Sequence, residues 1–287
     1  MSKEELIKIF EETIDIVSEH KSYEKSNGDM FDFKPVGETF TYKEKQQISD
    51  PAKTFDMTEI IVVNEDCLNV AQKYTKEGYK CAVLNMASFI RPGGGVLKGS
   101  AAQEESLFRR TNLFMSLYQF NPDMYKVTGI EKPILNVYPL PMEFGAIYSK
   151  DITVFRTSER TDGCRLMDEP FMVDILTIAA IKKPELTEDK KLPNWAVDVL
   201  KGKVEMMLDL CIIHGVDIPV LGAFGCGAYG TPPNEMAKIF RDVIGIKKYK
   251  GAFKRIIFPI LDDHNSHKEH NPEGNFKPFA ETLLKSI

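Results

Sequence analysis

Residues 82–107 read AVLNMASFIRPGGGVLKGSAAQEESL and combine a short apolar run, a glycine-rich stretch and an acidic helix start. Ala82–Leu84 is a candidate for a buried strand, residues 92–99 for a loop, and the segment from Ala102 to Phe120 for a helix. Three consecutive glycines lose much conformational entropy on folding, so they suit a backbone that adopts positive φ or passes close to a ligand. A plain turn between strand and helix explains the glycines alone equally well.

Glu104 and Glu105 lie at the start of this helix, ahead of the apolar Leu107 and Phe108. Carboxylates in a first turn are favoured by the helix dipole, so an ordinary acidic helix start accounts for the pair taken alone. Consecutive helix residues point about 100° apart, and the two carboxylates need not do the same job. The combination is a much more specific signature than any one feature alone: it joins a strand, Asn85, the triple glycine and the acidic pair.

Outside this stretch, short apolar runs typical of buried strands alternate with segments of helical periodicity. We expect strands at 60–63, 152–155, 171–178, 218–221 and 255–261, and helices at 3–20, 67–74, 195–213, 235–244 and 276–286. This alternation predicts an α/β layer fold with a largely central sheet. Residues 21–58 are polar and irregular, with one short strand at most. The simplest partition is an N-terminal helical extension over 1–57, packed on a single domain over 58–287.

The composition of the 287 residues, 43% hydrophobic and 28% charged, is that of a globular protein that needs no disulfide or metal to fold. A net charge of −5 argues against direct DNA binding, although backbone N–H groups can still hold the phosphates of a small molecule. No apolar run reaches the ~18 residues of a membrane span, and the N-terminus lacks a signal-peptide core. Five cysteines without a CxxC pair favour a reducing, cytoplasmic compartment.

A second glycine motif, GCGAYG over residues 225–230, follows a predicted strand and precedes a predicted helix. It is a literal GxGxxG, so an NAD-dependent enzyme is a real alternative. The motif nevertheless comes late in the chain. The acidic residues after the next strand, Asp262 and Asp263, also lie more than 30 positions past Gly230, instead of the usual ~20. A phosphate-holding turn for a diphosphate ligand fits better, and a plain strand-to-helix turn remains a third interpretation.

Three histidines, His264, His267 and His270, form an HxxHxxH pattern near the C-terminus. Imidazoles at this spacing can share a helix face and bind a transition metal. The surrounding Asn, Ser, Pro and Gly residues indicate a loop, and no Cys or acidic partner stands at metal-site spacing. A solvated loop is therefore the favoured interpretation, with a metal site as the alternative.

The triple glycine at 93–95 and the Gln103-Glu104-Glu105 that follows it resemble the signature of microbial-type poly(ADP-ribose) glycohydrolases, a branch of the macrodomain superfamily. In that family a triple glycine precedes Gln-Glu-Glu by a short spacer. Residues 85–88 (NMAS), 148–156 (YSKDITVFR) and 221–230 (LGAFGCGAYG) also look like segments of that family, and the resemblance covers about residues 58–265. The sequence departs from the family's pattern at residues 89–91, which are bulky and basic. This departure bears on substrate range more than on reaction class.

The resemblance implies a macrodomain-like three-layer α/β/α fold with a mixed central sheet. It also implies hydrolysis of ribose–ribose bonds in poly(ADP-ribose), release of ADP-ribose without a metal or other cofactor, and a place in the DNA damage response. Glu105 is then the acid that protonates the leaving ribose oxygen, a role that needs a raised pKa. Glu104 would hold ribose hydroxyls. The residues expected to bind substrate are Asp66, Asn85, Gly93, Gly94, Gly95, Val96, Gln103, Gly225, Cys226, Gly227, Ala228 and Tyr229.

Individual roles within this set follow from the same resemblance. Asn85 would contact the ribose beside the scissile bond, and the N–H groups of 93–96 and 225–229 would flank the diphosphate and the terminal ribose. Asp66 would read adenine, or would simply cap a helix that starts at the next residue. Cys226 lacks a paired base and is expected to fit the turn, not to act as a nucleophile. Tyr229 would form an aromatic wall beside the outer ribose and so favour exo cleavage.

Two alternatives share the same cleft. One is removal of single ADP-ribose units from an ADP-ribosylated protein, nucleic acid or small molecule. The other is a non-catalytic ADP-ribose reader, which the intact pair of glutamates disfavours because a reader has no evident use for a proton donor.

Overall fold

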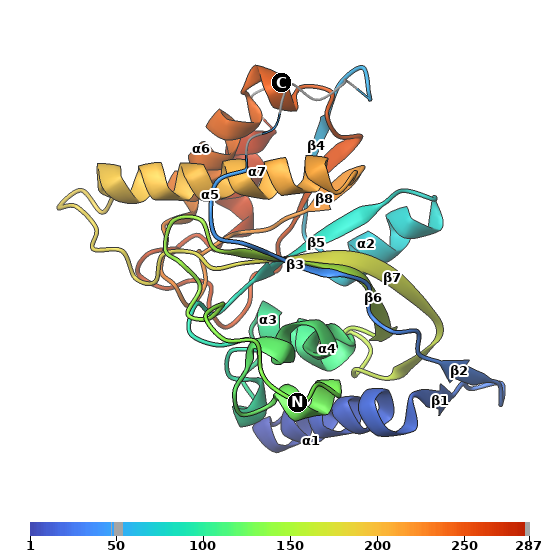
Figure 1. Cartoon of the computed structure of the whole chain (residues 1–287). Helices are drawn as coiled ribbons and strands as arrows, with labels where there is room; N and C mark the ends of the chain where they lie inside the picture. Colours follow the sequence, from blue (N-terminus) through green and yellow to red (C-terminus); the bar gives the residue numbers. More distant parts are fainter. Residues whose placement is uncertain (47, 49–53, 285–287) are drawn as a thin grey trace. The chain divides into compact units, whose positions relative to one another are not determined.

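The computed structural model describes residues 1–46, 48 and 54–284 of the chain (Figure 1). It divides into two compact units, each built from several stretches of sequence. Unit 1 comprises Met1–Thr41, Asn85–Pro141 and Ile147–Thr177, and unit 2 comprises Tyr42–Leu84, Met142–Ala146 and Ile178–Ile287.

A central mixed sheet of seven strands, flanked by helices, has the order β3-β6-β7-β5-β8-β9-β4. Its strands are β3 (Thr39–Tyr42), β4 (Glu59–Val63), β5 (Cys81–Met86), β6 (Ala146–Arg156), β7 (Leu166–Ile178), β8 (Ile218–Val220) and β9 (Arg255–Pro259). The α/β class predicted from the alternation of apolar runs is confirmed. The middle strand β5 is buried from Cys81 to Asn85, as expected for a strand covered on both faces.

Unit 1 contains the helices of its first two sequence segments. These are α1 (Lys3–Ile14), its π-helical continuation η1 (Asp15–His20), η2 (Val96–Lys98), α3 (Gln103–Arg110), α4 (Leu113–Leu117), η3 (Tyr118–Phe120) and η4 (Tyr125–Thr128). A capping box between Ser2 and Glu5 starts α1. The buried ring of Phe10 in α1 packs on those of Phe108, Phe114 and Tyr118, so α1, α3 and α4 lie together (Figure 1).

Unit 1 also contains a small hairpin of β1 (Ser22–Glu24) and β2 (Met30–Asp32), paired antiparallel with Tyr23 opposite Phe31. The hydroxyl of Tyr23 donates to the carbonyl of Met167 at the start of β7, at 2.6 Å. At the far end of β6, the N–H of Thr157 donates to the carbonyl of Arg165 and closes the β6–β7 hairpin.

Unit 2 holds the parallel part of the sheet. β4 pairs with β9, β9 with β8, and β8 with β5, all in parallel. The connecting helices are α2 (Cys67–Lys76), α5 (Asn194–Ile213), α6 (Pro233–Ile244), η5 (Lys247–Tyr249) and α7 (Phe276–Leu283). Figure 1 shows α5, α6 and α7 gathered together, and Phe240 of α6 packs on Phe258 and Phe279.

The single helix expected from Ala102 to Phe120 is wrong, because the chain leaves the helical path at Thr111. Thr111 is extended and forms an antiparallel bridge with Val154 of β6. The Asn112 side chain accepts from the N–H of Thr153 at 2.8 Å, and the Asn112 N–H donates back to the Thr153 carbonyl. Pairing with β6 thus interrupts the helix at residues 111 and 112 and separates α3 from α4.

The remaining elements mostly agree with the sequence pattern. Among the described residues of 21–58 there are three short strands instead of one at most, and β6 and β7 begin several residues earlier than their apolar cores suggest. The closing helix ends at Leu283, and the last residues of the expected range 276–286 lie outside the described residues. The boundary between residues 57 and 58 stays a prediction. Within the described residues, no helix is long and apolar enough to cross a membrane.

Candidate active site

The triple-glycine loop of unit 1 is shaped by two glycines with positive φ, Gly93 at 76° and Gly94 at 53°. A Cβ atom on Gly93 would lie 2.7 Å from the ring of Phe108. A Cβ on Gly94 would lie 2.6 Å from Oε1 of Glu105 and 3.0 Å from Oε2 of Glu104. Side chains are therefore excluded here both by backbone conformation and by space, and Gly94 faces the two carboxyl groups directly.

Glu104 is buried, with 4% of its surface exposed. Its Oε2 accepts from the N–H of Ser88 at 2.7 Å, and its Oε1 accepts from the N–H of Gly93 at 3.1 Å. These two bonds join the first turn of α3 to both ends of the loop that follows β5. They also satisfy a buried polar group that would otherwise be costly.

Glu105 is also buried, with 7% of its surface exposed. Its Oε1 accepts from the N–H of Gly95 at 2.8 Å, and its Oε2 accepts from the N–H of Ala102 at 3.2 Å. The second bond is the return half of a capping box, with Glu105 three positions into the helix. The acidic helix start is thus a real cap, and at the same time it brings a second carboxyl group to the glycine loop.

Burial raises the pKa of Glu104 from 4.5 to about 8. The hydrogen bonds from Ser88, Gly93 and Asn85 lower this pKa, and the nearby charge of Glu105 raises it. A carboxyl group with this pKa holds a proton at neutral pH. Glu104 is therefore uncharged at neutral pH, next to Glu105 in the first turn of α3.

Asn85 and Gln103 complete the group in unit 1. The Gln103 side-chain oxygen accepts from the N–H of Met86 at 2.9 Å, which ties the end of β5 to the start of α3. The Asn85 side chain donates to the hydroxyl of Thr177 at 3.2 Å. Its Oδ1 is buried and has no hydrogen-bond partner. An unpartnered buried acceptor costs about 1–3 kcal/mol, so Asn85 presents an acceptor suited to a ligand hydroxyl.

Buried polar side chains hold α3 in place behind the site. Arg109 makes two hydrogen bonds to the carboxylate of Glu159, at 2.7 and 3.0 Å, and a third to the carbonyl of Ser100 at 2.8 Å. The hydroxyl of Thr13 in α1 donates to the Arg109 carbonyl at 2.7 Å. The helix that carries both glutamates is thereby fixed to the glycine loop, to the β6–β7 connection and to α1.

The N–H groups of residues 93–96 do not have the arrangement expected from the sequence. Gly93 and Gly95 donate to the two glutamates, Gly94 donates to the carbonyl of Arg91, and Val96 donates to the carbonyl of Gly93. All four already have protein acceptors, so their geometry supports positioning of the carboxyl groups. Direct contact of Gly93, Gly94, Gly95 and Val96 with a ligand stays a prediction.

The second glycine loop belongs to unit 2 and is more open to a ligand. Gly225 has a φ of 76°, and a Cβ on it would lie 2.7 Å from the Thr231 hydroxyl oxygen. The N–H groups of Gly225, Gly227 and Ala228 donate to no acceptor among the described residues. Clustered backbone N–H groups of this kind favour anions such as phosphate.

Cys226 is fully buried within this loop, and burial raises the pKa of its thiol. Its N–H donates to the carbonyl of Ala223, and its thiol lies 3.5 Å from the carbonyl of Phe224. This agrees with a small residue that fits the turn, and contact of Cys226 with a ligand stays a prediction. The aromatic side chain of Tyr229 is only partly buried, and its backbone carbonyl accepts from the N–H of Lys183.

Asp66 is the N-cap of α2, as one of the two sequence interpretations expected. Its Oδ1 accepts from the N–H groups of Leu68 and Asn69, at 2.9 and 3.2 Å. Recognition of adenine by Asp66 stays a prediction.

The three histidines lie in a loop of unit 2. His267 contacts the carbonyl of Pro272, and His270 contacts the carbonyl of Cys226. No cluster of three or more His, Cys, Asp or Glu side chains suited to a metal occurs in the part of the chain that the structure describes.

Several residues of the site had no role in the sequence-based expectation. Ser88 and Ala102 act through backbone N–H groups, which leave no trace in residue type, although Ser88 lies within the NMAS segment. Thr177 supports Asn85, and Thr231 places a buried hydroxyl without a hydrogen-bond partner beside Gly225. These positions come from distant parts of the sequence and carry no local signal.

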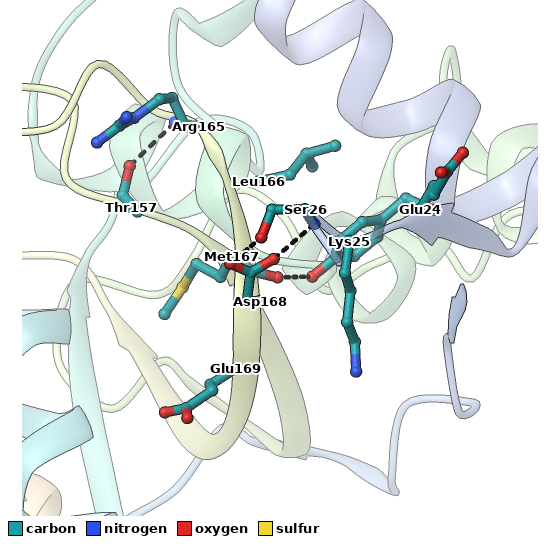
Figure 2. A pocket seen from close by; sticks show the side chains of 10 residues that line it. Glu24, Lys25, Ser26, Thr157, Arg165, Leu166, Met167, Asp168 and Glu169 are labelled. Carbon is teal, nitrogen blue, oxygen red and sulfur yellow. Dashed lines mark hydrogen bonds between the residues drawn. The ribbon is translucent and has the colours of Figure 1, made fainter. Parts of the chain in front are cut away.

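Unit 1 also has a hollow of about 510 Å³ between the β1–β2 hairpin and the start of β7 (Figure 2). None of the residues predicted for the site lines it. Figure 2 shows Ser26 bonded through its N–H and its hydroxyl to the carboxylate of Asp168, at 2.8 and 2.7 Å. The Asp168 carboxylate thus fastens the hairpin to β7, and the lining mixes both signs of charge.

Comparison with known proteins identifies a family model and related structures. The model described as "Microbial-type PARG, catalytic domain", where PARG is poly(ADP-ribose) glycohydrolase, matches residues 10–157. The poly(ADP-ribose) glycohydrolase of Thermomonospora curvata is 28% identical, with 96% of this chain and 98% of that chain covered and a TM-score of 0.74. The same enzyme bound to the inhibitor ADP-HPD has a TM-score of 0.73, with the same identity and coverage.

A further similar structure is the poly(ADP-ribose) glycohydrolase of Deinococcus radiodurans in complex with ADP-ribose. It is 25% identical, with 81% of this chain and 86% of that chain covered and a TM-score of 0.62. None of the curated proteins compared matches the chain.

The raised pKa of Glu104 predicts a specific dependence of stability on pH. Between pH 4.5 and about 8 the folded state holds a proton that the unfolded state releases, so stability is highest below this window and falls as pH rises through it. Glu104→Gln should remove this loss, which we expect to be on the order of 5 kcal/mol. Urea unfolding at several pH values measures it.

The variants are compared by the slope of their free energy of unfolding against pH. The glutamine amide also weakens the hydrogen bonds from Ser88 and Gly93, but this loss is the same at every pH and does not change the slope. The exposed Glu131→Gln variant is the control and should keep the wild-type slope. Identical slopes for wild type and Glu104→Gln would show that Glu104 is ionised throughout.

Proposed function

Because the chain belongs to the family of microbial-type PARG catalytic domains, we propose that it hydrolyses the ribose–ribose O-glycosidic bonds of poly(ADP-ribose) and releases ADP-ribose. The observation that carries this proposal is the pair of buried glutamates bonded to the N–H groups of a triple-glycine loop. The similar structures from T. curvata and D. radiodurans, which hold ADP-HPD and ADP-ribose respectively, support the substrate class.

The chemistry requires a proton donor at the leaving oxygen. Cleavage of a glycosidic bond passes through an oxocarbenium-like state, and protonation of the departing oxygen lowers its barrier. We assign this proton to Glu105. As the C–O bond breaks, the proton of Glu105 goes to the leaving ribose. Water then adds to the anomeric carbon and returns a proton to Glu105.

Glu104 and Asn85 would hold the ribose on which this happens. The raised pKa of Glu104 keeps its carboxyl group protonated near neutral pH. A protonated carboxyl group can donate one hydrogen bond and accept another, as a sugar hydroxyl requires. The unpartnered Oδ1 of Asn85 would accept from a further ribose hydroxyl.

The second loop would bind the diphosphate. The N–H groups of Gly225, Gly227 and Ala228 supply donors without basic side chains, which suits an anion in a protein of net charge −5. Asp66 would contribute to adenine recognition, in addition to capping α2. Tyr229, partly exposed at the end of this loop, would stand beside the outer ribose and close the cleft to a continuing chain.

The alternatives raised by the sequence are a nicotinamide-dependent oxidoreductase, a non-catalytic ADP-ribose reader and a mono-ADP-ribosyl hydrolase. A nicotinamide-dependent oxidoreductase has no support from the family match. A non-catalytic reader leaves the two buried carboxyl groups and their cost unexplained. A mono-ADP-ribosyl hydrolase would use the same machinery on another leaving group, and hydrolysis of mono-ADP-ribosylated protein tests it directly.

The cellular setting is part of the same proposal. We place the enzyme in a cytoplasmic, reducing environment, a placement supported by an odd number of cysteines without a CxxC pair. We also propose the role in the DNA damage response that the family resemblance implies, with no direct DNA binding.

Glu105→Gln tests the assignment of the acid. Loss of the proton donor should lower hydrolysis of poly(ADP-ribose) by about a hundredfold or more. Binding of ADP-ribose should stay within a few-fold of wild type, because glutamine keeps the size of the side chain. Chromatography of free ADP-ribose and calorimetric titration measure the two effects, with exposed Glu131→Gln as the control. Full hydrolysis by Glu105→Gln would overturn the assignment.

Tyr229→Ala tests whether the enzyme cuts at the end of the polymer or within it. The wild-type protein should release mainly ADP-ribose monomer from polymer of defined length, and removal of the aromatic wall should increase internal cutting. Gel sizing of products at early times distinguishes the two modes. Mid-length fragments with little monomer from the wild-type protein would contradict exo cleavage.

A further inference from the structure

The loop between β9 and α7 in unit 2, residues 260–275, is called the C-terminal loop. Two of its side chains converge on one backbone carbonyl of the second glycine loop. The Nε2 atom of His270 lies 2.9 Å from the carbonyl oxygen of Cys226, and the Nδ2 atom of Asn271 lies 3.1 Å from the same oxygen. Asn271 is fully buried, and Cys226 is as well. A carbonyl that accepts two side-chain donors at once is held in one orientation.

The orientation of this carbonyl determines where the next N–H points. The Cys226 carbonyl and the Gly227 N–H belong to the same peptide plane and, in a trans peptide, point in opposite directions. His270 and Asn271 pull the carbonyl to their own side, so the Gly227 N–H points to the opposite side. That N–H and its neighbours on Gly225 and Ala228 donate to no acceptor among the described residues.

The C-terminal loop is itself firmly held, so it can serve as a support. The Asn271 Nδ2 atom also lies 3.0 Å from the carbonyl oxygen of Asn265 and 2.8 Å from Oδ1 of Asn275, so its two hydrogens are shared among three acceptors. Oδ1 of Asp262 accepts from the Ser266 hydroxyl and from the N–H of Asn275, at 3.0 and 2.6 Å. The surroundings of the histidine pattern are thus a hydrogen-bonded scaffold.

We propose that His270 and Asn271 are positioning residues that fix the Cys226–Gly227 peptide and aim its N–H at the diphosphate of the ligand. The inference rests on the proposed function of the second loop. Neither side chain touches the ligand, and each acts through the Cys226 carbonyl. His270 is only partly buried, so it can be replaced with less damage to the fold than the fully buried Asn271.

A matched pair of uncharged variants tests this role. His270→Gln keeps a side-chain N–H donor, and His270→Leu removes it at similar size. His270→Leu should weaken ADP-ribose binding about tenfold and raise KM for poly(ADP-ribose) by a similar factor, with kcat within about twofold of wild type. His270→Gln should restore both values to within about threefold. Calorimetry and initial rates give these numbers, and His270→Ala is a second variant without a donor if His270→Leu fails to fold.

Adenosine separates an effect on the diphosphate from a general loss of structure. As a competitive inhibitor without phosphate, it should inhibit wild type and His270→Leu equally. Equal ADP-ribose affinities for His270→Leu and His270→Gln, or an equal loss for adenosine and ADP-ribose, would overturn the inference and leave the proposed function standing. If the wild-type protein neither binds ADP-ribose nor cleaves its polymer, the proposed function falls and the inference falls with it.

Discussion

The hydrogen bonds between the first turn of α3 and the loop after β5 are the interaction on which the rest of the site depends. Ser88 and Gly93 donate to Glu104, and Gly95 and Ala102 donate to Glu105. Two adjacent carboxyl groups can be buried only if their oxygens have partners and their mutual repulsion is relieved. Backbone donors meet the first need, and protonation of Glu104 meets the second.

The same bonds explain the composition of the surrounding sequence. The loop can reach the carboxyl groups because Gly93 and Gly94 adopt positive φ and because Gly94 leaves the space in front of both carboxyl groups unfilled. The helix keeps its place because Arg109 ties it to Glu159 and Ser100, and because Phe10 of α1 packs behind it. The N-terminal helix therefore belongs to the structure that holds the two glutamates.

Much of the site and fold was predictable because its signals are local. Alternating apolar runs predicted the α/β class, and the spacing of the triple glycine from Gln103-Glu104-Glu105 pointed to the two carboxyl groups. The break at Thr111 was missed because it depends on pairing with β6, far along the sequence. The engaged N–H groups of the glycine loop and the contact of His270 with Cys226 were missed for the same reason. Backbone donors and long-range partners leave no pattern in residue type.

The central claim is that the triple glycine leaves open the space in which the two glutamates meet substrate. Hydrolysis of poly(ADP-ribose) by Gly94→Ala, compared with Gly129→Ala, tests it most directly. Both glycines have positive φ, so both variants carry similar backbone strain, but a Cβ on Gly129 meets nothing within 4 Å. The account predicts that folded Gly94→Ala loses hydrolysis by about a hundredfold or more, whereas Gly129→Ala stays close to wild type. Equal activity of the two variants would contradict it.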